Sequence, residues 1–273
     1  MKYDNNRPPM AVILADGIGS RLSPMTDSSA KCLLSVGGSA ILERTIRNCL
    51  SCGISQFVLV LGHRADEIRH FVTKAFRGVR VTYVVNDRYR DTNTSYAMGM
   101  AASTIGSSEF IRIDADLVFD ARIVRQLTDS DLPNVLCIDS TSTRMTGQLN
   151  VIVDEQKHVL DVGASTDPAL AHGVSIGIDK ISSKMAPLLF AEITLMMENA
   201  ANLRADLETA YARLVKKGTV IHALDITSLK WTNIGTAEGF AAANAMFQSP
   251  ITTVSRGQQR ALDDAAEKES HPT

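Results

Sequence analysis

The residues best suited to chemistry stand together near the start of this sequence. Residues 11–14 are an apolar run typical of a buried strand, and Gly17, Gly19, Arg21 and Lys31 follow it closely. Glycine lets the backbone approach a ligand, and successive free N–H groups in such a turn bind anions. Arginine grips a phosphate through two donors, whereas lysine supplies a point charge on a flexible stem. The spacing predicts a polyphosphate-binding loop.

Two common phosphate-binding motifs fit this loop poorly. A dinucleotide fingerprint needs a third glycine where Leu22 stands, and it opens directly into a helix, whereas Pro24 and the polar residues 26–29 continue the loop. A P-loop ends in Gly-Lys-Ser/Thr, a tripeptide that this sequence lacks. An ordinary strand–turn–helix crossover remains the alternative to a phosphate site.

A pair of carboxylates follows another apolar run at residues 110–113. Asp114 and Asp116 stand two residues apart, just past the expected end of that strand. Carboxylate oxygens in this position suit a hard cation such as Mg²⁺. Their alternative role is to cap the next helix, for which Asp120 is better placed. We therefore expect a magnesium site formed by these two carboxylates.

The stretch 86–96 is dense in hydrogen-bonding side chains and follows a third apolar run. Open α/β sheets bind their ligands just beyond the carboxyl ends of the strands, where this stretch is expected to lie. The alternative is a solvated loop that caps the following helix, which Thr94 could do alone. The density of polar side chains favours a binding site.

The elements that must position these residues alternate between strand and helix. Expected strands over 11–14, 56–61, 79–85 and 110–113 are separated by expected helices over 40–52, capped by Ser39, over 65–76 and over 95–103. This rhythm predicts an α/β fold with a Rossmann-like, doubly wound, mostly parallel sheet. The later part predicts a helix over 121–127, strands over 135–138, 149–153, 159–162, 173–178 and 220–226, and helices over 182–199, 203–217 and 237–247, with a small antiparallel element.

We predict a single domain over residues 1–248. Its nucleotide-binding half spans about 10–133 and its acceptor-binding half about 134–248, and the polar residues 249–273 form a disordered tail. Net charge is −2 over 273 residues, which argues against nucleic acid as a partner. With no membrane-length apolar run or signal peptide, we expect a cytoplasmic protein without membrane contact. Cys49 and Cys52 have C-x-x-C spacing, but packing is favoured over metal or redox chemistry.

The stretch over residues 10–38, called the front loop below, resembles a signature of the nucleotidyltransferases that make sugar and alcohol nucleotides. That signature typically reads L-A-A-G-x-G-x-R-L-x-P-x-T followed by P-K-x-L. Asp16 departs from the usual small residue, and Ala30 from the usual proline. The stretch 86–96 is similar to that of cytidylyltransferases for phosphocholine and phosphonates. The residues that match this second pattern are Asn86, Tyr89, Thr92, Asn93 and Tyr96.

The resemblance implies the fold of nucleotide-diphospho-sugar transferases and a Mg²⁺-dependent transfer of CMP, with CTP as the expected nucleotide. The acceptor would be a small phosphate or phosphonate, phosphocholine-like, and pyrophosphate would leave. A homodimer is left open. The implied site comprises catalytic Lys31 and Arg21, a nucleotide-binding set of Leu14, Ala15, Asp16, Gly17, Gly19, Ser20, Arg21, Gly62 and Asn86, acceptor-binding Asn93, Ser95 and Tyr96, and metal-binding Asp116 and Asp114.

Two departures from the family pattern lie in the second half of the chain. Family members usually read W-x-E-I-D-T, whose aspartate is a second metal ligand, and Gly235 stands at that place here. Ala164 stands where a lysine commonly reaches the acceptor phosphate. Two alternatives therefore stay open: a sugar-1-phosphate nucleotidylyltransferase, and a non-catalytic nucleotide-binding relative.

Overall fold

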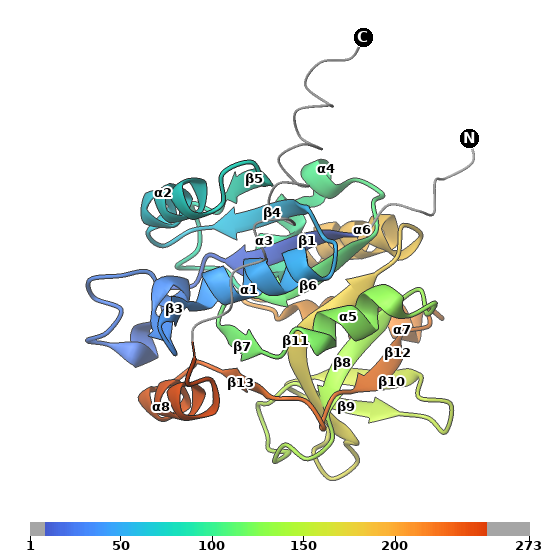
Figure 1. Cartoon of the computed structure of the whole chain (residues 1–273). Coiled ribbons are helices and arrows are strands. Elements are labelled where there is room, and N and C mark those ends of the chain that lie inside the picture. Colours follow the sequence, from blue (N-terminus) through green and yellow to red (C-terminus); the bar gives the residue numbers. More distant parts are fainter. Residues whose placement is uncertain (1–8, 250–273) are drawn as a thin grey trace.

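The computed structural model describes residues 9–249 of the chain. These residues form a nine-stranded sheet with the order β10-β9-β11-β6-β1-β4-β5, in which β8 pairs with β11 and β12 pairs with β8 (Figure 1). The strands are β1 (Met10–Ala15), β4 (Gln56–Leu61), β5 (Arg80–Val85), β6 (Phe110–Asp114), β8 (Val135–Asp139), β9 (Asn150–Val153), β10 (Val159–Gly163), β11 (Gly173–Ile181) and β12 (His222–Asp225).

Strand direction confirms the predicted fold class. β1 lies between β4 and β6 and is parallel to both, and β5 is parallel to β4. The antiparallel element of the second half joins the same sheet, because β11 runs antiparallel to β6, β8 and β9. The carboxyl ends of β1 and β6 are therefore neighbours, as the predicted site requires.

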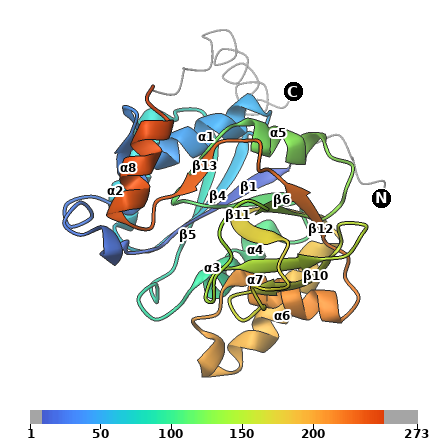
Figure 2. The ribbon, with the colours of Figure 1, turned by 90° about the horizontal axis from the view of Figure 1, so that it is seen from below.

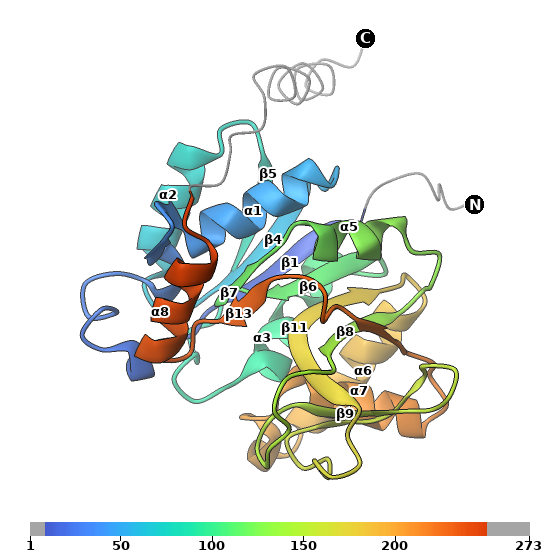
Figure 3. The same cartoon turned by 60° about the horizontal axis from the view of Figure 1, so that its bottom comes forward.

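Helices cover both faces of this sheet (Figures 2 and 3). Two apolar clusters show the division: α1, α2 and α5 pack on one face, and α3, α4, α6 and α7 pack on the other. The helices are α1 (Ile41–Ser51), α2 (Ala65–Ala75), α3 (Thr94–Met100), α4 (Ala102–Ile105), α5 (Arg122–Asp129), α6 (Met185–Met197), α7 (Leu207–Lys216) and α8 (Ala237–Met246).

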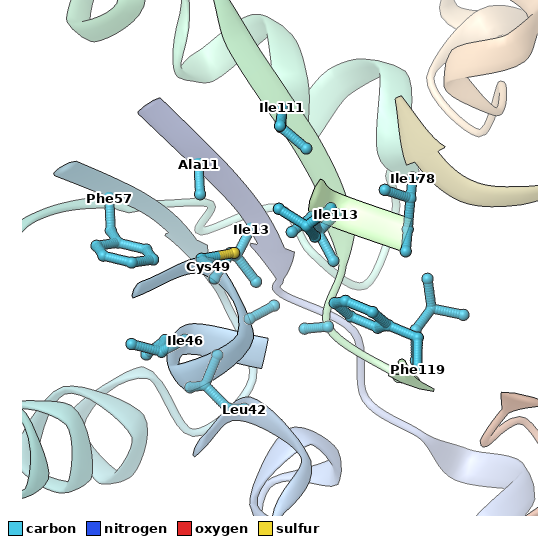
Figure 4. Packing of buried hydrophobic residues seen from close by; sticks show 14 of the residues in the cluster. Ala11, Ile13, Leu42, Ile46, Cys49, Phe57, Ile111, Ile113, Phe119 and Ile178 are labelled. Carbon is cyan, nitrogen blue, oxygen red and sulfur yellow. The ribbon is translucent and has the colours of Figure 1, made fainter. Parts of the chain in front are cut away.

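Packing between α1 and the central strands follows the predicted helical face (Figure 4). Leu42, Ile46 and Cys49 of α1 are fully buried against a cluster that includes Ile13 of β1 and Ile113 of β6. Burying one such side chain contributes about 1.5–3 kcal/mol to stability. All four cysteines are free, which agrees with a packing role for Cys49.

Two small strand pairs and three short 3₁₀ helices complete the described fold. They are β2 (Ser35–Val36) with β3 (Ser39–Ala40), β7 (Leu117–Phe119) with β13 (Trp231–Asn233), and η1 (Ser20–Leu22), η2 (Lys31–Leu33) and η3 (Ala200–Asn202). The antiparallel pairing of β13 with β7 returns the late part of the chain to Asp116. The backbone N–H of Ile234 donates to the Asp116 carbonyl oxygen at 2.8 Å.

Several local predictions were wrong for reasons visible in the structure. Ser39 does not cap α1, because it pairs within β3 and Ala40 is the N-cap residue. The side chain of Asn93, not that of Thr94, caps α3, and the expected helix over 95–103 divides at Ala101 into α3 and α4. β7 was not predicted, since its partner strand lies more than a hundred residues away.

The later elements are present with shifted ends. The helices expected over 182–199 and 203–217 begin at Met185 and Leu207, and the strand expected over 173–178 continues to Ile181. Both predicted halves contribute strands to one sheet, and the boundary between them stays a prediction. The predicted tail lies outside the described residues except for Ser249. No helix within residues 9–249 has the length and apolar character needed to cross a bilayer.

Candidate active site

A cavity of about 310 Å³ opens where the carboxyl ends of β1 and β6 meet. Its size falls at the lower end of the range for small-molecule sites. Most of its lining comes from the front loop and the Asp114–Asp116 turn, and the remainder from α2, α3 and the end of β13. The lining residues are Leu14, Ala15, Asp16, Gly17, Arg21, Ala30, Lys31, Cys32, Ile68, Asn93, Thr94, Asp114, Ala115, Asp116 and Asn233.

The front loop is shaped by Gly19 and tied to α2. Gly19 has a φ of 72°, and a Cβ there would lie 3.0 Å from the Cβ of Lys31, so a larger residue would strain both the backbone and the contact. Glu67 of α2 accepts a hydrogen bond from the Ser29 hydroxyl at 2.9 Å and from the Ala30 N–H at 3.2 Å. The loop is therefore anchored to the first turn of α2.

The two predicted cations differ in what they contact. Arg21 lies on η1 with an exposed side chain that makes no hydrogen bond or ion pair within residues 9–249, so its guanidinium is free to bind an anion. Lys31 begins η2, and its Nζ lies 2.6 Å from Oδ2 of Asp116. The lysine thus links the front loop to the carboxylate turn.

Both carboxylate oxygens of Asp116 have partners. Oδ2 pairs with Lys31, and Oδ1 accepts a hydrogen bond of 3.0 Å from the side-chain amide of Asn233. Within the described part of the chain, no group of three or more histidine, cysteine or acidic side chains is arranged to hold a metal. The Asp116 carboxylate is therefore charge-balanced by one lysine and hydrogen-bonded by one neutral amide.

The residue that faces Asp116 from the second half of the chain is Asn233, not Gly235. A Cβ at Gly235 would lie 2.9 Å from Oδ1 of Asn233 and 3.5 Å from a terminal nitrogen of Arg21. Alignment to the family pattern had singled out Gly235. Residues 231, 233 and 235 would share one face of a continuous strand, so alternation does not separate Asn233 from Gly235, whereas the end of β13 at Asn233 does. Ala164 lies outside the cavity lining, with its carbonyl accepting from Gly147.

Asp114 borders the cavity and belongs to a buried ionic cluster behind it. Its Oδ2 lies 3.4 Å from the fully buried guanidinium of Arg112, while its Oδ1 is buried without a hydrogen-bond partner. Arg112 also lies 2.9 Å from Glu208 and 3.3 Å from Asp179. Burial raises the pKa of Asp114 well above its ordinary value, although Arg112 opposes the shift. The metal role of Asp114 stays a prediction.

The predicted nucleotide-binding residues divide into lining and supporting groups. The segment 14–17 and Arg21 line the cavity, whereas Gly19, Ser20, Gly62 and Asn86 do not. Gly62 packs beneath Asp16, because a Cβ at Gly62 would lie 2.9 Å from the Asp16 Cβ. Asn86 is fully buried and donates to Oδ2 of Asp16 at 2.7 Å.

Of the three predicted acceptor-binding residues, the structure brings only Asn93 to the cavity. Its side-chain amide donates to Oδ1 of Asp206 at 2.8 Å. Ser95 is fully buried and donates to the backbone oxygen of Asp206, and Tyr96 lies against the Arg88 guanidinium at 5.6 Å. Asp206, which the sequence did not single out, therefore anchors this edge of the cavity to the start of α7.

The geometry agrees with a family comparison. Residues 10–143, which include the front loop, the stretch 86–96 and the Asp114–Asp116 turn, match the family described as nucleotidyl transferase. The first half of the chain is therefore similar to the nucleotidyl transferase family. This match confirms the resemblance inferred from the front loop. The relatives are nucleotidyltransferases, as expected.

Two curated relatives are cytidylyl-type enzymes by name. The CMP-5'-(3-aminopropyl)phosphonate synthase of Streptomyces rubellomurinus is 31% identical over 120 residues, 44% of this chain and 19% of its own. The choline-phosphate cytidylyltransferase of Streptococcus pneumoniae is 30% identical over 132 residues, 48% of this chain and 56% of its own. The chain thus spans about a fifth to just over half of the length of these relatives.

A solved structure confirms the fold over nearly the whole described chain. A protein of Bacillus anthracis named as a glucose-1-phosphate thymidylyltransferase superposes with a TM-score of 0.74 at 21% identity. The match covers 90% of this chain and 97% of that one. The Rossmann-like fold of nucleotidyltransferases therefore extends beyond residue 143, into the half that carries Asn233.

Proposed function

We propose that the chain is a Mg²⁺-dependent nucleotidyltransferase that uses CTP and transfers CMP to a small phosphate or phosphonate acceptor, phosphocholine-like, with release of pyrophosphate. The observation that carries the proposal is the meeting of Arg21, Lys31 and Asp116 in one cavity at the strand ends. The names of the phosphonate and choline-phosphate relatives support the choice of nucleotide and acceptor.

The reaction follows from the charges of its substrates. An oxygen of the acceptor phosphate or phosphonate attacks the α-phosphorus of the triphosphate, and the bond from that phosphorus to the bridging oxygen of pyrophosphate breaks. The attacking oxygen is already anionic at neutral pH, so no general base is required. Because two polyanions must meet, catalysis depends on positioning and charge neutralisation.

The cationic side chains of the cavity are assigned separate tasks. The unpartnered guanidinium of Arg21 and the N–H groups of the front loop hold the triphosphate. Lys31 exchanges its contact with Asp116 for one with the α-phosphate, which it neutralises during transfer. Asn93, fixed by Asp206, lies on the acceptor side.

The donor set around Asp116 fits a magnesium ion that arrives with the nucleotide. Magnesium keeps several waters and uses one or two carboxylates together with substrate phosphates. Asp116 supplies one carboxylate, and the Asn233 amide supplies a carbonyl oxygen once it rotates. The bound ion would neutralise phosphate charge shared by nucleotide and acceptor.

A sugar 1-phosphate is the second candidate for the acceptor. The superposition on the Bacillus anthracis protein, named for glucose 1-phosphate, extends over both halves of the chain and favours this candidate. In such an enzyme, the part of the cavity next to Asn93 would bind the neutral, hydroxyl-bearing sugar ring. The two candidates share the chemistry at phosphorus and differ in the acceptor and the base.

The proposal is tested by measuring nucleotide binding and pyrophosphate release with the full chain. Each of the common nucleoside triphosphates is titrated with and without Mg²⁺, and release is followed with phosphocholine, 2-aminoethylphosphonate and glucose 1-phosphate. We expect metal-dependent binding of CTP and release with one of the first two acceptors. Release only with glucose 1-phosphate would select the second candidate. Binding without release would indicate a non-catalytic relative, and no binding at all would refute nucleotide chemistry.

A matched pair of variants tests the position of the second metal ligand. Asn233→Asp places a carboxylate beside Asp116 in nearly unchanged volume, so Mg²⁺-dependent triphosphate binding should strengthen by about tenfold, or about 1.4 kcal/mol. Gly235→Asp directs its carboxylate toward Arg21 and should not strengthen this binding. A gain from Gly235→Asp alone would show that the assignment of Asn233 is wrong.

A further inference from the structure

We propose that Asp16 selects the base of the nucleotide, because its carboxylate accepts a hydrogen bond from an exocyclic amino group on the base. Cytosine carries such a group on its pyrimidine ring, whereas uracil and thymine present a carbonyl oxygen at the same place. The inference rests on the proposed function in that it requires a nucleotide in the cavity. It assigns a specificity-determining role to a residue at which the chain departs from the family pattern.

Asp16 lies where a base could be enclosed. It follows the last residue of β1 and lines the cavity, and its backbone oxygen accepts from the His63 N–H at 3.2 Å, just before α2 begins. The first turn of α2 supplies Ile68, and Glu67 of that turn holds Ala30 by its N–H. Ile68 and Ala30 also line the cavity, so apolar walls lie near the carboxylate.

The orientation of the carboxylate is set by Asn86. This fully buried amide donates to Oδ2 of Asp16 at 2.7 Å and to the Thr92 hydroxyl at 3.0 Å, while its own oxygen accepts from the Arg88 N–H at 3.0 Å. Every polar atom of the Asn86 side chain is therefore committed, and only donors face Asp16. Asn86 occupies one oxygen of the Asp16 carboxylate, and the other oxygen keeps its acceptor capacity at a residue that lines the cavity.

Charge decides which part of a nucleotide can approach Asp16. Arg21 and Lys31 in the same cavity lining attract the triphosphate, and the carboxylate of Asp16 repels phosphate. A neutral donor is therefore the suitable partner for Asp16. A base carbonyl placed there would leave two acceptors facing each other in a partly buried site, which lowers affinity by about tenfold to a hundredfold.

The test compares CTP with UTP, which differ at the position in question. Wild-type chain should bind CTP at least about tenfold more tightly than UTP. In Asp16→Asn the new amide must turn its oxygen toward the donor of Asn86, and its amino group then faces the cavity. This variant should therefore reverse the preference and favour UTP. Asp66→Asn, at an exposed carboxylate of α2, is the matched control and should leave both affinities unchanged.

The outcomes separate this inference from the proposed function. Equal wild-type affinity for CTP and UTP overturns the role of Asp16 while leaving nucleotide binding intact, and it needs no variant. A uniform loss of all triphosphates in Asp16→Asn, with an unchanged unfolding midpoint, assigns Asp16 to the ribose hydroxyls and also overturns it. Absence of any triphosphate binding by wild-type chain overturns the proposed function itself and the inference with it.

Discussion

The two faces of the central sheet are buried by different chemistry. On the face covered by α1, α2 and α5, the strands present apolar side chains such as Ile13 and Ile113 to apolar helices (Figure 4). On the face covered by α3, α6 and α7, the alternate residues of β6 include Arg112 and Asp114, and the apolar packing surrounds a buried ionic cluster. Both faces contribute to the cavity lining, and the second face adds charged contacts that reach Asp114.

Arg112 is the centre of this difference. Its guanidinium contacts Asp114 in the cavity wall, Asp179 of β11 and Glu208 of α7. Asp206, two residues before Glu208, holds Asn93 at the edge of the cavity. Directional charge contacts thus connect α7, and through Asp206 the Asn93 edge of the cavity, to the sheet. Removing one partner of such a buried cluster leaves an uncompensated charge, which is costly.

The largest expected effect is the loss of Arg112. Arg112→Met leaves Asp179 and Glu208 buried without their cation, so the free energy of unfolding should fall by about 3–5 kcal/mol. Urea unfolding measures the change, with Arg122→Met as control, because Arg122 pairs with Asp120 at an exposed site worth under about 1 kcal/mol. Equal losses in the two variants would contradict the role of the buried cluster.

A void created among the apolar side chains should lower the free energy of unfolding by less than the loss of Arg112. The size of this loss should not depend on pH. Ile13→Ala removes buried methyl groups, so the free energy of unfolding should fall by about 3 kcal/mol. This loss should be the same at about pH 5 and about pH 8, whereas the cost of Arg112→Met should shrink at the lower pH, where the abandoned carboxylates take up protons. Denaturant unfolding at both pH values checks the contrast, and parallel pH responses would abolish it.

Lys31 begins η2 and lines the cavity, so its loss should affect turnover rather than stability. Lys31→Ala should lower pyrophosphate release by about a hundredfold, or about 2.7 kcal/mol in the transition state, since a neutralising charge is removed. The unfolding free energy should change by less than about 1 kcal/mol, because the pair with Asp116 is partly exposed. Lys74→Ala, at the exposed end of α2, is the control. A loss of less than about tenfold would remove Lys31 from catalysis.

The smallest effect per pH unit is expected from Asp179, as a slope in the plot of unfolding free energy against pH. Burial raises the pKa of Asp179 to about 7, against an ordinary 3.8, so the folded chain holds a proton that the unfolded chain releases between these values. Stability should therefore fall as pH rises through this window, by at most about 1.4 kcal/mol per pH unit. Asp179→Asn should flatten that part of the curve of unfolding free energy against pH. An unchanged slope would show that Asp179 does not titrate there.

Periodicity in the sequence was sufficient to predict the apolar face. The buried stripe of α1 at Leu42, Ile46 and Cys49 and the parallel strands follow from local spacing. The ionic face could not be predicted in the same way, because the partner of Arg112 on α7 lies 96 residues away. An arginine within a strand that reads as buried was the available signal.

The candidate site shows the same division. Arg21, Lys31 and Asp116 were predicted from the glycine loop and the carboxylate turn, and the structure brings them to one cavity. Asn233 was missed because its contact with Asp116 spans 117 residues and depends on which side of β13 faces β7. The family pattern points to Gly235, whereas the pairing of β13 with β7 places Asn233 over the carboxylate. Local motifs thus predicted one wall of the site, and the return of the chain determined the other.

The pairing of β13 with β7 also has a consequence for synthesis. Trp231, Thr232 and Asn233 emerge from the ribosome after every strand of the main sheet, yet Asn233 completes the cavity beside a turn made more than a hundred residues earlier. Contacts of such long sequence separation form late, since the intervening chain must first be ordered. A nascent chain can thus form its front loop long before its cavity is complete. A chain whose synthesis stops before Asn233 would carry that loop without the full cavity lining.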